Sequence, residues 1–357
     1  MSHAWIDRPA PTRPGEALDL ARLGPYLRAA LDLPEAAEIA AEQFPGGHSN
    51  LTYLLRVDGR ELVLRRPPLG AHVASGHDMS REFRVLNRLA PAWPLAPRPL
   101  HFCGDPGPLG APFYLMERLT GVILRRRLPP GLELTPALAE ALCGAFIDVL
   151  VGLHGLDLRA HHLDELGRPD GYVTRQVHGW TQRYRDARTD DHPAIDRVID
   201  QLHAQIPPAG APALIHNDLK YDNLVLDPDH LTRVRGVLDW EMSTVGDPLM
   251  DLGTALAYWI EPGDPPALQA LAFGPTAAPG SFTRRQLAER YAERSGRDLE
   301  HIVFYYAFGL FKTAVVAQQI YKRYQLGHTQ DPRFAAMGVA VKALVCQAER
   351  SLDARVL

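Results

Sequence analysis

Residues 213–241 constrain the fold of this chain more than any other stretch. They read ALIHNDLKYDNLVLDPDHLTRVRGVLDWE, in which apolar runs alternate with clusters of polar residues. Two of the apolar runs are separated by DPDHLTR, a turn-forming composition, so the spacing predicts a β-hairpin. His216, Asp218 and Asn223 precede this hairpin, and Asp239 follows its second strand. Oxygen-bearing side chains therefore stand on both sides of one hairpin in the sequence.

The spacing of these polar residues is that of a kinase catalytic loop, in which an Asp follows a His by two residues and precedes an Asn by five. Phosphoryl transfer needs Mg²⁺ held by hard oxygen ligands, and Asn223 and Asp239 suit that role. It also needs a carboxylate beside the attacking hydroxyl, for which Asp218 is the candidate. Lys220 would neutralise charge on the transferred group. Loop residues that merely cap strands and turns are the alternative, but the coincidence of loop, hairpin and VLDW argues against it.

A β-rich segment precedes this region. The runs LTYLLRV and ELVLRR flank Asp58-Gly59, a strong hairpin signal, and residues 78–90 predict a helix capped by Asp78 or Ser80. The turn PGGHSN before them would lie over nucleotide phosphates, although an ordinary glycine-rich turn is an equal alternative. Its candidate phosphate contacts are Gly46, Gly47, Ser49 and Asn50.

The next candidates for binding a nucleotide lie on the predicted strands and helix of this segment. Alternation along LVLRR puts Arg65 and Arg66 on opposite faces, so only one points into a cleft, and we favour Arg65. Glu82 on the following helix would pair with that arginine, as a kinase strand lysine pairs with a helix glutamate. The segment YLMER would be a hinge that binds adenine, with Met116 and Glu117 as candidate contacts.

These motifs together resemble the aminoglycoside-phosphotransferase-like (choline-kinase-like) family. Within it, the chain is most similar to the kinase-like domain fused to acyl-CoA dehydrogenase and to its stand-alone bacterial relatives. The similarity runs from about residue 44 to 327. The stretches that carry it are FPGGHSNLTYLL, LVLRRPPLG, REFRVL, YLMERLTG, RQVHGWTQRY, HNDLKYDNLV, VLDWEMSTVGDPLMDLG and FYYAFGLFKTAVVAQQIYKRYQLG.

The resemblance implies an α+β, bilobal, protein-kinase-like fold that uses ATP and Mg²⁺. It implies Asp218 as base, Asn223 and Asp239 as metal ligands, Arg65 as a phosphate contact, and Asp251 as a residue that holds the catalytic-loop backbone. The chain departs from the family in having Asn217 where Gly is frequent. It also has an arginine, in place of lysine, on the third strand, and these two cations are not equivalent.

The pattern predicts three parts. Residues 1–35 form an arm and a helix that Pro25 bends or breaks. Residues 36–117 form a small, nucleotide-binding lobe of antiparallel strands and one helix, and residues 118–357 form a larger, mainly helical lobe that is catalytic and binds the acceptor. The sequence leaves open whether ATP or GTP is preferred. Helical patterns of the larger part begin at Thr135-Pro136 and cover about 174–188, 194–205, 249–260, 283–295, 299–326 and 332–353.

The phosphate acceptor is expected to be a small molecule with a hydroxyl group. Residues 252–330 hold six acidic and eight basic side chains, which disfavours a polycationic aminoglycoside and permits a neutral or anionic acceptor. The resemblance suggests a hydroxyacyl-CoA or related hydroxy acid, with Arg175 and Arg323 as weaker candidates for contacting its acidic groups. An aminoglycoside O-phosphotransferase and a catalytically silent, nucleotide-binding, kinase-like protein are the alternatives. The intact Asp218, Asn223 and Asp239 argue against the silent protein.

Composition excludes other classes. The 38 basic and 42 acidic residues give a net charge of −4, which argues against nucleic acid as a partner. No apolar run is long enough to predict a membrane span. Cys103, Cys143 and Cys346 are far apart in sequence, so neither a disulfide framework nor a cysteine zinc site is expected. With no apolar N-terminal signal, these features predict a cytoplasmic protein whose oligomeric state the sequence leaves open.

Overall fold

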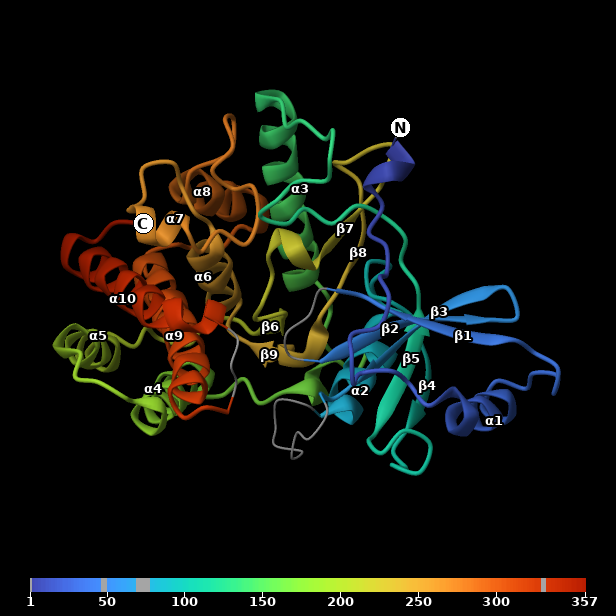
Figure 1. Cartoon of the computed structure of the whole chain (residues 1–357). Coiled ribbons are helices and arrows are strands. Elements are labelled where there is room, and N and C mark those ends of the chain that lie inside the picture. Colours follow the sequence, from blue (N-terminus) through green and yellow to red (C-terminus); the bar gives the residue numbers. More distant parts are fainter. Residues whose placement is uncertain (1, 46–49, 69–77, 329–331) are drawn as a thin grey trace. The chain divides into compact units, whose positions relative to one another are not determined.

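The structure, a computed structural model, describes residues 2–45, 50–68, 78–328 and 332–357, and the chain divides into two compact units (Figure 1). Unit 1 comprises Met1–Ile123, Arg159–Leu163 and Asn223–Ser243. Unit 2 comprises Leu124–Leu158, Asp164–Asp222 and Thr244–Leu357. The catalytic loop, residues 216–223, crosses from unit 2 into unit 1 just before Asn223, so each unit holds part of the sequence-predicted site.

Unit 1 is built on an antiparallel sheet in the order β1-β2-β3-β5-β4. Its strands are β1 (Ile39–Gln43), β2 (Leu51–Val57), β3 (Arg60–Arg66), β4 (Pro99–Cys103) and β5 (Phe113–Glu117). Asp58 and Gly59 both have positive φ, 48° and 74°, between paired residues Val57 and Arg60. A two-residue turn of this hand matches the twist of the strands, so the predicted hairpin is confirmed.

Two helices of unit 1 accompany the sheet. In α1 (Leu20–Ala30), Leu23 and Leu27 are buried in one apolar cluster with residues of β2, β3 and β5. The expectation that Pro25 bends or breaks this helix is wrong in its stronger form, because α1 continues through Pro25. The second helix, α2 (Met79–Leu89), begins at Asp78, whose carboxylate accepts hydrogen bonds from the backbone N–H groups of Ser80 and Arg81.

The hairpin predicted within residues 213–241 is present, and both of its strands belong to unit 1. Strand β7 (Leu224–Leu226) pairs antiparallel with β8 (Val234–Val237), and a short 3₁₀ turn, η4 (Trp240–Met242), follows. Reciprocal backbone hydrogen bonds of 2.8 Å join Val122 and Leu226. Gly121 is required beside them, because a Cβ there would lie 2.3 Å from the Leu226 carbonyl oxygen.

Unit 2 is mainly helical and contains one small two-stranded sheet, β6 (Ala213–Ile215) with β9 (Thr244–Gly246) (Figure 1). The predicted helical segments of this part are confirmed apart from shifts at their ends. The helices are α3 (Pro136–His154), α4 (Tyr172–Ala187), α5 (Pro193–Ala204), α6 (Pro248–Tyr258), α7 (Pro266–Gln269), α8 (Arg284–Ser295), α9 (Ile302–Gln325) and α10 (Met337–Ala354). Short 3₁₀ turns occur at Ser2–Trp5, Asp164–Leu166, Tyr221–Asn223 and Pro332–Ala336.

In the described part of the chain, α3 alone is long and apolar enough to cross a membrane by length and composition. Its apolar face is used within unit 2, where Leu142, Phe146 and Leu150 are buried. Asp148 on the same helix forms an ion pair with Arg294 of α8, with a donor–acceptor distance of 3.1 Å from Nε. A helix that packs an apolar face inside a protein passes the same compositional test as a membrane span.

Helices α6 and α9 cross at two glycines. A Cβ on Gly253 of α6 would lie 2.3 Å from the carbonyl oxygen of Tyr305, and one on Gly309 of α9 would lie 2.5 Å from the carbonyl oxygen of Gly253. The two backbones therefore touch, which side chains larger than hydrogen would prevent. The crossing sets the spacing between the helices that carry Asp251, Tyr258 and Lys312.

We expect Gly253→Ala to destabilise the protein by about 2–3 kcal/mol, because a methyl group at this crossing forces the two backbones apart. Gly144→Ala on α3 is the matched control. Apart from the adjacent residues and the backbone of its own helix, no described atom lies within 4 Å of its added Cβ, so the higher helix propensity of alanine should stabilise by about 0.5–1 kcal/mol. Urea unfolding measures both free energies. Equal stability of the two variants would contradict the close approach of α6 and α9.

Candidate functional site

In unit 1, the Arg65 side chain is buried among carboxylates. Its Nη2 donates to Asp239 Oδ1 at 2.8 Å and lies 3.7 Å from Glu241 Oε2, and its Nε lies 3.4 Å from Glu82 Oε2. Arg65 is the penultimate residue of β3. Glu82 belongs to α2, Glu241 belongs to η4, and Asp239 immediately precedes η4. The structure thus brings together Arg65, Glu82 and Asp239, three of the sequence-predicted residues.

Arg66 has a different environment from Arg65. Its guanidinium donates to the carbonyl oxygens of Pro67 and Leu109, at 3.3 and 3.1 Å. The strand alternation therefore separates the two arginines, and only Arg65 reaches the carboxylates. Burial lowers the pKa of Arg66. Burial acts in the same sense on Arg65, but the charges of Glu82, Asp239 and Glu241 hold the pKa of Arg65 well above its ordinary value.

Glu82 is the most deeply buried acid of this cluster, with 1% of its surface exposed. It lies on the buried face of α2, and its Oε1 accepts a hydrogen bond from the Trp240 backbone N–H at 3.2 Å. Burial raises the pKa of Glu82, against the lowering effect of the Arg65 charge. One guanidinium faces three carboxylates here, so the cluster is suited to accept a further cation.

Asn223 and Asp239 leave the same end of the β7–β8 hairpin. Leu224 pairs with Val237, and the Leu238 backbone N–H donates to the Asn223 carbonyl oxygen at 2.8 Å. Asp239 has a φ of 70°, a left-handed conformation that is costly for a residue other than glycine and typical of functional sites. An amide oxygen and a carboxylate at one hairpin end, beside an excess of acid, fit Mg²⁺, which completes its shell with phosphates and water.

The remaining nucleotide-site candidates have mixed outcomes. Gly46, Gly47 and Ser49 lie outside the described residues. Asn50 is buried, and its Nδ2 donates to Glu241 Oε2 at 2.6 Å, which places it at the same cluster. Met116 and Glu117 lie in β5. Met116 is buried opposite Val63 of β3, whereas the Glu117 carboxylate accepts a hydrogen bond from the Arg98 backbone N–H at 2.8 Å.

We expect Arg65→Met to destabilise the protein by about 3–5 kcal/mol, because it leaves Glu82 buried without its counter-charge. The double variant Arg65→Met/Glu82→Met should recover part of that loss. Arg66→Met is the control, since the hydrogen bonds of this neighbouring arginine to described residues go to carbonyl oxygens, and it should cost about 1 kcal/mol. Chemical unfolding completes the double-mutant cycle. Additive losses for Arg65 and Glu82 would show that the two residues are not coupled.

In unit 2, both carboxylate oxygens of Asp218 are engaged. Tyr258 donates its hydroxyl to Oδ1 at 2.6 Å, and the Lys220 ammonium bonds Oδ2. Burial alone would raise the pKa of Asp218, but the Lys220 charge and the hydrogen bonds from Lys220 and Tyr258 outweigh it and lower that pKa. The structure thus places the predicted base beside Lys220, as a carboxylate that is ionised at neutral pH.

Asp251 fixes the backbone that carries Asp218. Its two oxygens accept the backbone N–H groups of His216, at 2.6 Å, and Asn217, at 2.8 Å. His154 supports the same carboxylate at 3.1 Å and contacts the Tyr291 hydroxyl at 2.8 Å on its other ring nitrogen. The role that the resemblance implied for Asp251 is confirmed. Burial would raise the pKa of Asp251, but these donors lower it.

Two residues near Asp218 escaped the sequence reasoning. One is Tyr258, at the last turn of α6. The other is Lys312 of α9, which is 4% exposed and donates its Nζ–H to the Asn217 carbonyl oxygen at 2.5 Å. Burial lowers the pKa of Lys312 to about 8. The available signal was a single charged residue within the apolar run FYYAFGLFKTAVV, which a purely structural helix would rarely contain.

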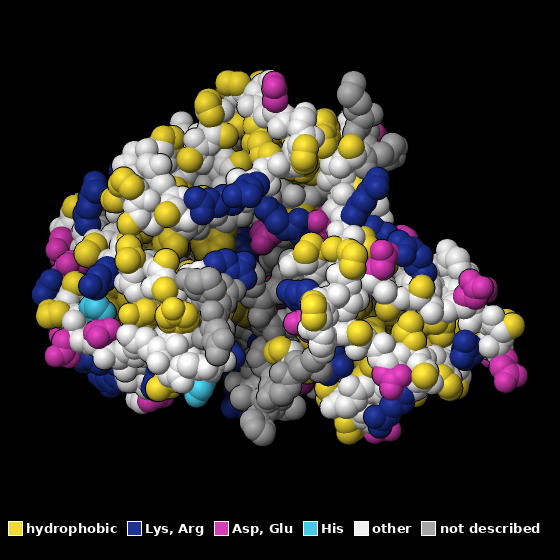
Figure 2. Space-filling model, viewed as in Figure 1, with side chains coloured by type: hydrophobic (Ala, Val, Ile, Leu, Met, Phe, Trp, Pro, Cys, Tyr) yellow, Lys and Arg dark blue, Asp and Glu magenta, His cyan; other side chains and the backbone are white. Residues whose placement is uncertain are grey.

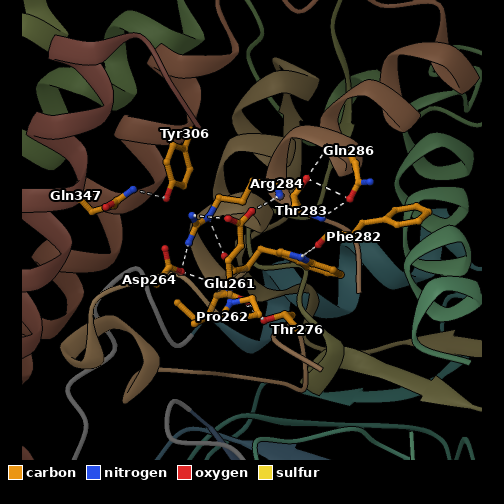
Figure 3. A network of polar contacts seen from close by, with 12 residues as sticks. Glu261, Pro262, Asp264, Thr276, Phe282, Thr283, Arg284, Gln286, Tyr306 and Gln347 are labelled. Atoms are coloured by element: carbon orange, nitrogen blue, oxygen red, sulfur yellow. Dashed lines mark hydrogen bonds and ion pairs between the residues drawn. The ribbon is translucent and has the colours of Figure 1, made fainter. Parts of the chain in front are cut away.

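A buried polar network fixes the loop that follows Tyr258 (Figure 3). Arg284 at the start of α8 donates its Nε–H to the Trp259 carbonyl oxygen at 2.8 Å and forms an ion pair with Asp264. Its guanidinium also lies 5.3 Å from the ring centroid of Tyr306 on α9. The network connects the end of α6 to α8 and α9 and so fixes the backbone at Trp259, the residue after Tyr258.

We expect Tyr258→Phe to lower kcat about tenfold, because Asp218 loses a charge-assisted hydrogen bond that orients it. The same loss raises the pKa of Asp218, so the acid limb of the kcat profile should move to higher pH. Tyr184→Phe is the control, since this buried hydroxyl on α4 has no hydrogen-bond partner among the described residues. A pH profile with an unmoved acid limb in Tyr258→Phe would contradict this role.

Comparisons with known proteins agree on one family. Residues 40–290 match the model of the phosphotransferase enzyme family. The chain is 36% identical over 323 residues to acyl-CoA dehydrogenase family member 10 of Mus musculus, which covers 90% of this chain but 30% of that relative's length. A solved structure of a presumed aminoglycoside phosphotransferase from Ralstonia eutropha is 30% identical, with a TM-score of 0.78 over 95% of this chain and 99% of that one.

A more distant structure shares the fold. It is an aminoglycoside phosphotransferase in ternary complex with AMP-PNP and hygromycin B, 16% identical, with a TM-score of 0.56 over 90% of this chain and 97% of that one. The resemblance and the protein-kinase-like α+β fold class that the sequence indicated are confirmed by these similarities.

Proposed function

The chain belongs to the phosphotransferase enzyme family, whose members transfer phosphoryl groups to hydroxyls, and from that premise we propose its donor and acceptor. The donor is ATP, used with Mg²⁺, and the acceptor is the hydroxyl of a small anionic molecule such as a hydroxyacyl-CoA or a related hydroxy acid. The observation that carries the choice of acceptor is the set of cations around Asp218 in unit 2.

Unit 1 supplies the groups for the nucleotide. Asn223 and Asp239 would hold Mg²⁺, which when bound neutralises phosphate charge and orients the transferred group. Arg65 would contact phosphate, while Glu82 keeps its guanidinium in place. The AMP-PNP complex of the distant structural neighbour supports ATP as the donor. The excess of carboxylates over guanidinium in this cluster supports the binding of a cation.

Asp218 would orient the acceptor hydroxyl and receive its proton. Its lowered pKa keeps it ionised, so it accepts a hydrogen bond from the hydroxyl before reaction. A carboxylate with a low pKa is a weak base, and proton transfer therefore follows the formation of the new P–O bond rather than preceding it. Lys220, bonded to Asp218, would offset negative charge on the transferred group.

The charges around Asp218 favour an anionic acceptor. Lys220 bonds Asp218, Lys312 is close enough to lower its pKa, and Arg183 is in turn close enough to lower the pKa of Lys312. Figure 2 shows Lys and Arg interspersed with Asp and Glu over the face that it displays. The name of the Mus musculus relative, an acyl-CoA dehydrogenase family member, supports an acyl acceptor.

The alternatives fit less well. A polycationic aminoglycoside would meet Lys220 and Lys312 beside the base, and like charges repel. A silent nucleotide-binding protein would have no need for Asp218, Asn223 and Asp239 together, yet all three are present. Arg175, one weaker candidate for contacting the acceptor, bonds instead to the carbonyl oxygens of Arg168 and Asp170 next to the start of α4.

A nucleotide-consumption screen tests the proposal. ATP and GTP are each offered with hydroxyacyl-CoAs, free hydroxy acids, aminoglycosides and amino alcohols, and the anionic acceptors should be turned over with ATP and Mg²⁺. Asp218→Asn should lower kcat at least about a hundredfold while leaving nucleotide binding intact. Asp239→Asn should abolish the Mg²⁺-dependent shift in Tm that ATP produces. Turnover of aminoglycosides alone would overturn the anionic acceptor.

A further inference from the structure

We propose that Arg183, Trp180 and Lys312 form a subsite that binds the acidic group of the acceptor. The inference rests on the proposed phosphotransfer and adds to it the residues that would select the substrate. All three belong to unit 2, two on α4 and one on α9. The ligand chemistry is an anion, either the carboxylate of a hydroxy acid or a phosphate of a CoA ester.

The indole of Trp180 is the common element of the subsite. The Arg183 guanidinium carbon lies 4.6 Å from its ring centroid, and Lys312 Nζ lies 5.8 Å from it. Trp180 itself is 7% exposed, and its Nε1–H donates to Gln176 Oε1 at 3.2 Å, which fixes the plane of the ring. Attraction to the indole ring thus holds both cations at the same aromatic side chain.

Among the residues that the structure describes, the buried Lys312 ammonium has one hydrogen-bond acceptor. An ammonium group carries three N–H bonds, and the hydrogen bond from Lys312 goes to the Asn217 carbonyl oxygen. Charged groups near it are Asp218 and Lys220 on the catalytic loop, Asp251 on α6 and Arg183 on α4. Burial and the two cations lower its pKa, and the two carboxylates raise it. A bound anion would give the remaining N–H groups an acceptor and favour the charged form.

Arg183 is exposed and, within the described residues, has no carboxylate at ion-pair distance. Its charge contributes to lowering the pKa of Lys312, which means that two like charges are held within reach of each other. Two like charges at one indole repel each other, and an anion bound beside them reduces that repulsion.

Lys312 also connects this subsite to the reaction. Its partner Asn217 immediately precedes Asp218, and Asn217 has a φ of 66°, a conformation fixed by Asp251 and by the 3.0 Å hydrogen bond from its side chain to Tyr172. An acid group bound at Lys312 therefore lies beside the loop that carries the base. An acceptor whose hydroxyl is a few bonds from its acid group would present that hydroxyl to Asp218.

The test compares Arg183→Gln with Arg185→Gln. Both are exposed arginines of α4, but Arg185 lies toward His203 of α5, whose pKa it lowers. Three probes share one hydroxyacyl group: 3-hydroxybutyrate, 3-hydroxybutyryl-CoA and the uncharged N-acetylcysteamine thioester. Arg183→Gln should raise KM about tenfold for an anionic probe, with kcat within about twofold and KM for ATP unchanged. Arg185→Gln should match the wild type.

The pattern across probes identifies the anion. A rise in KM for the free acid alone assigns the carboxylate, and a rise for the CoA ester alone assigns a phosphate. An equal KM rise for the uncharged thioester, or identical behaviour of Arg183→Gln and Arg185→Gln, overturns the subsite. Lys312→Arg keeps the charge and should retain more of the affinity than Lys312→Met, which a merely space-filling role would not produce.

A binding measurement separates this inference from the proposed function. Pyrophosphate and 3-hydroxybutyrate are titrated calorimetrically into the full chain without nucleotide. Binding to wild type and Arg185→Gln that is lost in Arg183→Gln supports the subsite even if the screen yields no turnover of anionic acceptors. Failure of both probes to bind wild type overturns the subsite, whereas the phosphotransferase proposal then stands or falls on the screen alone.

Discussion

The hydrogen bonds from the catalytic-loop backbone to the Asp251 carboxylate are the contacts on which the position of Asp218 in unit 2 depends. Asp251 accepts hydrogen bonds from the backbone N–H groups of His216 and Asn217 and so holds Asn217 in a left-handed conformation. The conformation of Asn217 sets the position of the next residue, Asp218. These hydrogen bonds depend on the position of α6, which carries Asp251. Helix α6 packs against α9 with direct backbone contact at Gly253 and Gly309. A local loop geometry therefore rests on a helix crossing remote from it in sequence.

The charge clusters of the two units have opposite excess charges. In unit 1, carboxylates outnumber the guanidinium of Arg65, and the imbalance suits a metal ion that brings phosphates with it. In unit 2, Lys220, Lys312 and the exposed Arg183 give three cations against the two carboxylates of Asp218 and Asp251, and this excess suits an anion. In each unit, a bound ligand of opposite charge would compensate the excess, because charges removed from water are stable only when they are paired.

The sequence predicted the parts of the site that depend on short-range order. The hairpin, the catalytic-loop spacing and the separation of Arg65 from Arg66 all follow from turn chemistry and strand alternation, which act over a few residues. Lys312 and Tyr258 could not be derived this way. Lys312 lies 95 residues from its partner Asn217, and only the packing of α9 against α6 brings the two together. Pro25 illustrates the converse, since apolar burial of Leu23 and Leu27 overrides a local helix breaker.

The low pKa of Asp218 also limits what the protein can do. Tyr258 and Lys220 stabilise the ionised carboxylate, and every increment of that stabilisation weakens it as a proton acceptor. This arrangement would be self-defeating in an enzyme that must generate an alkoxide before attack. It suits phosphoryl transfer through a loose transition state. There the hydroxyl must first be oriented, and its proton becomes acidic only as the new P–O bond forms. The electrostatics around Asp218 thus favour phosphoryl transfer over other reactions of a hydroxyl group.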